Sequence, residues 1–138
     1  MSNAAPSQSL TRFLPAIARF LLGLVFFVFG LNGFLNFIPQ PKEALPELIT
    51  VMIKSGYMFP LIAGTQVVVG ALLLLNRFVP LALALIAPVI VNIFAFHLFL
   101  VPSGMVIAIV VSLLEIYLAW SYRKSFRPML AARVTPGE

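Results

Sequence analysis

The chain has 138 residues, of which 62% are hydrophobic and only 9% are charged, and its mean hydropathy is +1.09. Soluble domains carry roughly 25% charged residues, so this composition argues against a soluble enzyme. It also argues against intrinsic disorder, and the absence of cysteine excludes a disulfide scaffold and thiolate chemistry. The formal net charge is +5, but the basic residues lie outside the apolar runs and do not alternate with aromatic residues, so no nucleic-acid partner is expected.

Four stretches are long and apolar enough to cross a bilayer, for which about 20 residues are needed. Residues 1–12 are expected to form a disordered tail, and the four spans follow at 20–38, 57–75, 78–101 and 104–122. Their apolar character is continuous and does not alternate, which predicts helices and not barrel strands. The predicted membrane domain covers residues 13–123, and a basic cytoplasmic tail follows at 124–138.

The connection between the first two spans contains its own predicted helix. Pro39 and Pro41 end the first span. Beyond them, apolar residues recur with helical spacing at Leu45, Leu48, Ile49, Met52 and Ile53. Pro46 begins and Gly56 ends this helix, which is too short to span and is expected to lie in the membrane interface. Two interpretations stay open: a lid over the outer mouth of the bundle, or a connector on the membrane surface.

The remaining connections are short, at residues 76–77 and 102–104, so consecutive spans are expected to be antiparallel neighbours. Seven basic residues lie on one side of the spans and two, Lys42 and Lys54, on the other; the seven are Arg12, Arg19, Arg77, Arg123, Lys124, Arg127 and Arg133. This imbalance predicts that both termini are cytoplasmic. The predicted fold is all-α, an integral membrane antiparallel four-helix bundle with a short interfacial amphipathic helix between helices one and two.

Glu115 is the only acidic residue within the predicted spans. It shares a helix face with small residues such as Ala108 and Ser112, which lets another helix approach closely. Gln66 of the second span is its predicted partner, and Arg19 near the cytoplasmic boundary is an alternative. Glu115 is the candidate catalytic residue, as a proton carrier or a neutral hydrogen-bond donor to a ligand carbonyl, and a purely structural pair is the alternative.

Asn32, Gln66, Asn92, His97 and Glu115 are the candidate ligand-binding residues. For the amides, hydrogen bonds between helices are the alternative role. His97, near the outer boundary, has either a redox or proton role or a structural, snorkelling placement. Because it is the only histidine and the chain has no cysteine, no metal site or bis-histidine haem is expected.

Several segments together resemble the DoxX-like family of small four-helix bacterial membrane proteins. They read RFLLGLVF at 19–26, GLNGFL at 30–35, NRFVPLA at 76–82, VNIFAFHLFL at 91–100 and AWSYR at 119–123. The resemblance covers residues 12–130 and implies a location in the bacterial inner membrane. Some members of the family are linked to quinone-dependent oxidation of thiosulfate or to membrane oxidoreductase complexes. The chain departs from the family pattern at Phe34, where relatives often carry Lys, and at Gln66, where they often carry Glu.

The expected function is that of a membrane-embedded subunit of a quinone-linked redox system. An apolar cleft would hold a non-covalently bound quinone, with Asn92, Gln66 and Glu115 supplying hydrogen bonds or a proton. The expected partners are the lipid bilayer, a redox protein that supplies electrons, and further copies of the chain as a homo-oligomer. The alternative is a non-catalytic membrane scaffold or a small-molecule binding or transport protein.

Overall fold

The computed structural model describes residues 6–39 and 44–137, and all regular secondary structure in these ranges is helical. Four long helices form the body: α1 (Pro6–Leu35), α3 (Met58–Leu74), α4 (Val79–Phe99) and α5 (Met105–Ser121). The shorter helices are α2 (Glu47–Lys54) and α6 (Arg123–Phe126), with 3-10 turns η1 (Pro102–Gly104) and η2 (Pro128–Leu130). The prediction of an all-α fold is confirmed.

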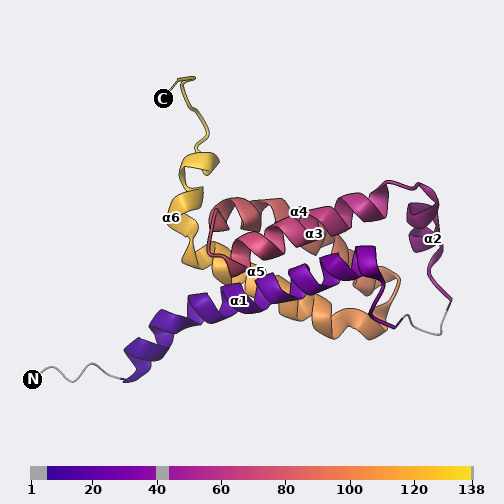
Figure 1. Ribbon diagram of the computed structural model, residues 1–138. Coiled ribbons are helices and arrows are strands. Elements are labelled where there is room, and N and C mark those ends of the chain that lie inside the picture. Colours follow the sequence, from indigo (N-terminus) through magenta and orange to yellow (C-terminus); the bar gives the residue numbers. More distant parts are fainter. Residues whose placement is uncertain (1–5, 40–43, 138) are drawn as a thin grey trace, which may run out of the picture.

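The four long helices form a closed ring of neighbours (Figure 1). Helix α1 packs on α3, α3 on α4, α4 on α5, and α5 on α1. Consecutive long helices run in opposite directions, so the start of α1 and the short helix α6 lie at one end of the bundle, and α2 lies at the other (Figure 1). The two ends therefore carry different parts of the sequence, and the end at α2 holds the clefts described below.

Helix α1 begins earlier and ends earlier than its predicted span. It starts at Pro6, so residues 6–12, which were expected to form a disordered tail, are helical; residues 1–5 lie outside the described part of the chain. Proline suits a first helical turn, and extending an existing helix costs little. The helix ends at Leu35 because Asn36 adopts a left-handed conformation, with φ 52°, and its N–H donates to the carbonyl of Asn32 at 2.8 Å.

The other long helices match their predicted spans to within two residues at each end. Asn76 and Phe78 have positive φ values of 55° and 51°, and Pro80 is the second residue of α4, so this turn is as tight as the sequence indicated. The predicted amphipathic helix is present as α2, which follows Pro46 and ends just before Gly56, with φ 78°. The basic tail starts as the helical turns α6 and η2, and Phe126 packs against the core.

Helices α1 and α3 are in backbone contact, through glycines on both helices. A Cβ atom placed on Gly70 of α3 would lie 2.4 Å from the backbone nitrogen of Phe27 and 2.8 Å from the carbonyl oxygen of Gly23. A Cβ atom on Gly30 would lie 2.7 Å from the backbone nitrogen of Val67. Close packing through small residues of this kind is common between helices in membranes.

Arg19 joins α1 to the end of α3. Its guanidinium donates to the carbonyl of Leu73, and Nη1 lies 3.5 Å from the carbonyl oxygen of Leu74. These carbonyls belong to the last turn of α3, where the N–H partners of the helix interior run out; that of Leu73 also accepts from the N–H of Asn76 at 3.3 Å. A cation there satisfies them and interacts favourably with the helix dipole, so Arg19 acts as a cap supplied by the neighbouring helix.

A single apolar core fills the bundle, yet most of the apolar surface faces outward. The largest fully buried side chains include Phe26, Leu73 and Ile86. Large apolar side chains on the outside of the helices, such as Leu61 and Ile116, are 61% and 65% exposed. Soluble monomers rarely expose contiguous apolar surface on this scale.

Three helical segments are long and apolar enough to cross a membrane: Thr11–Leu35, Val79–Phe99 and Pro102–Ser121. Helices α2 and α3 together form a fourth candidate, bent by 92° at the break between them. The 17 residues of α3 alone rise about 25 Å, at the short end of the range for a span. The fold thus has the helices that a multi-pass membrane protein requires.

Candidate ligand-binding cleft

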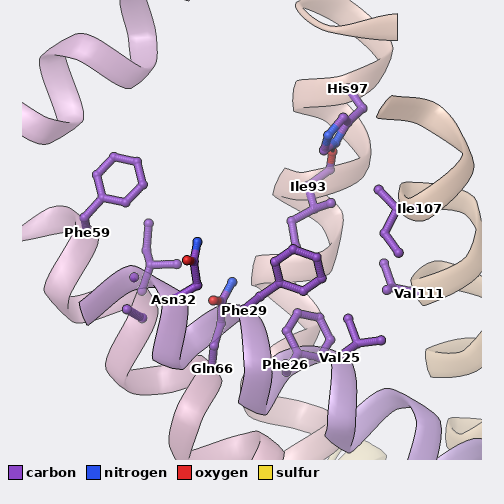
Figure 2. A pocket seen from close by; sticks show the side chains of 13 residues that line it. Val25, Phe26, Phe29, Asn32, Phe59, Gln66, Ile93, His97, Ile107 and Val111 are labelled. Carbon is purple, nitrogen blue, oxygen red and sulfur yellow. Dashed lines mark hydrogen bonds between the residues drawn. The ribbon is translucent and has the colours of Figure 1, made fainter. Parts of the chain in front are cut away.

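A cleft of about 320 Å³ opens between all four long helices, in the half of the bundle nearest α2. Its walls are mainly apolar and include Val25, Phe26, Phe29, Phe59, Ile62, Ile93, Ile107 and Val111. Three polar side chains, Asn32, Gln66 and His97, also line it (Figure 2). A few polar groups set among apolar and aromatic walls are typical of small-molecule sites. We call this the inner cleft.

A larger space of about 1070 Å³, the outer cleft, lies at the mouth of the bundle beneath α2. Asn32, Gly33, Phe59 and His97 line both clefts, so the two are adjacent. The α2 side contributes Leu45, Pro46, Ile49 and Ile53. No residue of α2 is buried, so the apolar stripe predicted for this helix partly faces the mouth of the bundle without being packed into the core.

Asn32 lies in the last turn of α1 and binds the chain that follows. Its Oδ1 accepts a hydrogen bond from the N–H of Ile38 at 2.7 Å. The bond holds the turn at Asn36 in place, and it leaves the Nδ2 amino group without a partner among the residues that the structure describes. Because an amide nitrogen can only donate, Asn32 offers a hydrogen-bond donor to a molecule in the cleft.

Gln66 lies on α3, half-buried, and lines the inner cleft. Within the described ranges its side chain makes no hydrogen bond to protein. Figure 2 shows the side chains of Gln66 and Asn32, which line the cleft from α3 and α1. Hydrogen bonds of serine and threonine elsewhere, such as Thr65 to Leu61 and Ser112 to Ala108, stay within their own helices. Gln66 thus has free donor and acceptor capacity where a ligand would meet it.

His97 lies in the last turn of α4, where the inner and outer clefts meet. Its Nδ1 is 2.8 Å from the carbonyl oxygen of Ile93, and the ring makes an edge contact with Phe96, with centroids 5.3 Å apart. The ring also lies against Gly104: a Cβ atom there would be 2.6 Å from Nε2. The hydrogen bond and the glycine together set the orientation of the imidazole.

Glu115 is buried, with 9% of its surface exposed, but it does not line either cleft. Its Oε2 is fully buried, with no hydrogen-bond partner in the described part of the chain. The predicted pair with Gln66 is wrong, because α5 packs on α1 and α4 while Gln66 points into the cleft from α3. The alternative pair with Arg19 is also absent, since Arg19 caps α3. Glu115 lies one helical turn beyond Val111, which lines the inner cleft.

Asn92 is not part of the site. Its side chain is exposed on α4 and lines neither cleft, so the expectation that it shares an interior with Gln66 and Glu115 is wrong. Helix α4 is apolar almost all round, so its sequence has no periodicity that distinguishes the inner side from the outer side. Of the five candidates, the structure brings together Asn32, Gln66 and His97, and places Glu115 near them.

The aromatic walls formed by Phe29 and Phe59 were not among the predicted site residues. A signal for Phe59 was present, because it precedes Gln66 by seven residues and so shares its helix face. Within the described residues, no group of three or more histidine, cysteine, aspartate or glutamate side chains lies close enough together to hold a metal ion. The arrangement offers apolar walls, aromatic faces and a small set of hydrogen-bonding groups.

No protein-family model matches this chain, and no curated protein or solved structure is found to match it.

Proposed function

We propose that the protein is a multi-pass membrane protein that binds a flat, mostly apolar ring molecule of the quinone class in the inner cleft. The observation that carries the proposal is the composition of that cleft. Apolar and aromatic side chains from four helices surround two amides with unused hydrogen-bonding capacity and one imidazole. Both amides are half-buried, and a ligand carbonyl or hydroxyl could take up their unused hydrogen-bonding groups.

The outward-facing apolar surface supports the membrane part of the proposal, because lipid would cover the side chains that water would not tolerate. Trp120 and Arg123 are exposed at the end of α5, with the guanidinium 4.5 Å above the indole ring. Aromatic and basic residues are enriched where helices leave the bilayer. In the proposed orientation the four long helices form an antiparallel four-span bundle in the bacterial inner membrane, with this end at the cytoplasmic side. Helix α2 then lies in the interface on the opposite side.

A quinone fits the chemistry of the cleft. Its ring is apolar on both faces, which suits Phe29 and Phe59, and its carbonyl oxygens accept hydrogen bonds of the kind that the Nδ2 group of Asn32 and the amide of Gln66 can donate. The outer cleft, adjacent to the inner one, would offer a route for a ligand or its apolar tail. Binding of this kind is non-covalent and exchangeable.

The resemblance to the DoxX-like family extends the proposal to a redox role. The protein would then be the membrane-embedded subunit of a quinone-linked redox system, with a partner protein as the source of electrons. Glu115, one helical turn beyond Val111 on α5, would hold a proton near the cleft without contacting the ring. The same cleft would also serve a protein that binds or transports small molecules without redox chemistry, and the wide opening beneath α2 favours that second candidate.

The proposal is tested by measuring quinone binding to the purified protein in lipid nanodiscs, together with solvent extraction of any quinone that co-purifies. We expect wild type to bind a decyl-substituted benzoquinone, and Gln66→Leu to weaken its binding about tenfold through loss of one hydrogen bond in an apolar site. Asn92→Leu is the matched control, because it removes an amide that is outside both clefts. Absence of binding in wild type, or equal affinities for the two variants, would count against the cleft as the site.

A further inference from the structure

The hydrogen-bonding groups of the cleft differ in what they offer a ligand. Asn32 uses its Oδ1 to hold the N–H of Ile38, which leaves its Nδ2 as a donor. Gln66 can either donate or accept, because neither end of its amide is bonded to described protein groups. The third group, His97, depends on which ring nitrogen carries hydrogen.

The carbonyl of Ile93 determines that choice. A carbonyl oxygen has no hydrogen to give, so the 2.8 Å contact is a hydrogen bond only if Nδ1 carries the proton and donates it. In the neutral ring, Nε2 is then unprotonated and can only accept. Gly104 lies against this edge of the ring, and the absence of a side chain there leaves room for the imidazole to keep this orientation.

Asn32 therefore offers the inner cleft a donor, and His97, which lines both clefts, carries an acceptor at Nε2. A ring that carries only carbonyl oxygens can accept from Asn32, but its lone pairs make no hydrogen bond with the unprotonated Nε2 of the half-buried imidazole. A hydroxyl oxygen accepts as a carbonyl does, and its O–H also donates. One hydroxyl-bearing ring can satisfy both residues.

We propose that the cleft selects rings bearing a hydroxyl donor, such as phenols or the reduced hydroquinone form, over rings that bear only acceptors. The Nε2 atom of His97 is the group that accepts the hydrogen bond from the hydroxyl. The inference rests on the proposed function, because it assumes that a ring molecule occupies the inner cleft. His97 is a specificity-determining residue in this scheme. The selection is a matter of binding and needs no electron transfer.

The experiment compares two redox-inert probes, a decyl-substituted phenol and its methyl ether, which differ in the hydroxyl hydrogen that the ether lacks. Calorimetric titration at pH 8, with the protein in lipid nanodiscs, is expected to show that wild type binds the phenol about tenfold more tightly than the ether, as loss of one hydrogen bond in a mainly apolar cleft predicts. In His97→Phe the ring and its contact with Phe96 are kept, but the acceptor is lost. The phenol and the ether should then bind with affinities equal within about twofold, and the ether should bind as it does to wild type.

Gly104→Ala provides a second variant if His97→Phe fails to fold. The added methyl would meet His97 and displace the ring without removing it, so the preference for the phenol should fall here too, while Gly64→Ala, with open space around its Cβ position, should keep it. Equal binding of phenol and ether to wild type, or a preference that survives in both His97→Phe and Gly104→Ala, would overturn the inference while leaving ring binding intact. If neither probe nor the quinone binds wild type, the proposed function itself fails.

Discussion

Replacing Gly70 with alanine should force α1 and α3 apart. The new Cβ atom would lie 2.4 Å from the backbone nitrogen of Phe27 and 2.7 Å from its Cα, whereas ordinary contacts begin near 3.4 Å. Both neighbours are backbone atoms, so no side chain can rotate away, and the helices must separate by roughly 1 Å. Overpacking of this kind costs about 1 to 3 kcal/mol, so we expect a loss of about 2 kcal/mol in the free energy of unfolding.

Gly64→Ala is the matched control, because it lies on the same helix but its Cβ would meet no atom within 4 Å. Both substitutions replace glycine by alanine within α3, so the change in helix propensity, about 1 kcal/mol, cancels when the two variants are compared. The difference between them reports the steric cost alone. Reversible unfolding in mixed micelles, followed by far-ultraviolet circular dichroism, measures it. If Gly70→Ala unfolds at the same denaturant fraction as Gly64→Ala, the close contact of α1 and α3 is refuted.

Three further substitutions test individual side chains. Arg19→Ala removes the cap from α3 and should lower the free energy of unfolding by about 1 to 2 kcal/mol. Arg77→Ala, at an exposed position, is the control and should change it by less than about 0.5 kcal/mol in the same assay. Equal effects of the two substitutions would contradict the capping role of Arg19. Glu115→Leu removes a buried oxygen that has no partner among the described residues, so it should raise the free energy of unfolding by about 1 kcal/mol or more. The affinity for quinone should stay unchanged within about twofold, because the residue lies outside both clefts. A large loss of affinity would place Glu115 in the site. Gly104→Ala should lower the free energy of unfolding by about 1 to 3 kcal/mol in the wild-type background, but only slightly when His97 is already alanine. Additive effects in this double-mutant cycle would show that the imidazole ring and the glycine are not in contact.

The positions of the helices could be predicted closely from the sequence, because their ends depend on local signals. Asn76 and Pro80 mark the tight turn before α4, and Pro46 and Gly56 enclose α2. The start of α1 was missed because residues 6–12 are too polar for a membrane span, although polar residues propagate a helix as readily once it exists. Hydropathy identifies the apolar part of a helix and not its full length.

The partners of the polar residues could not be predicted, for a physical reason. In a helix that is apolar on every side, the hydrophobic pattern does not reveal which face meets protein and which meets lipid. Asn92 and Gln66 each lie among small residues, yet only Gln66 faces the cleft. The similar depths of Gln66 and Glu115 within their spans suggested that the two side chains pair. Which helices are neighbours, however, depends on their order around the four-helix bundle, and α3 and α5 are on opposite sides of it. The hydrogen bonds of Asn32 and His97 to backbone atoms leave no trace in the sequence pattern.

Because α2 is weakly attached, the rates at which a molecule enters and leaves the inner cleft should vary independently of the affinity with which it binds there. No residue of α2 is buried, and Gly56 in the left-handed region joins it to the rest of the bundle. Swinging this helix away from the mouth would break little packing, whereas the walls of the inner cleft belong to the long helices and would not move. Changes in α2 should therefore alter association and dissociation rates together, and leave the equilibrium constant almost untouched.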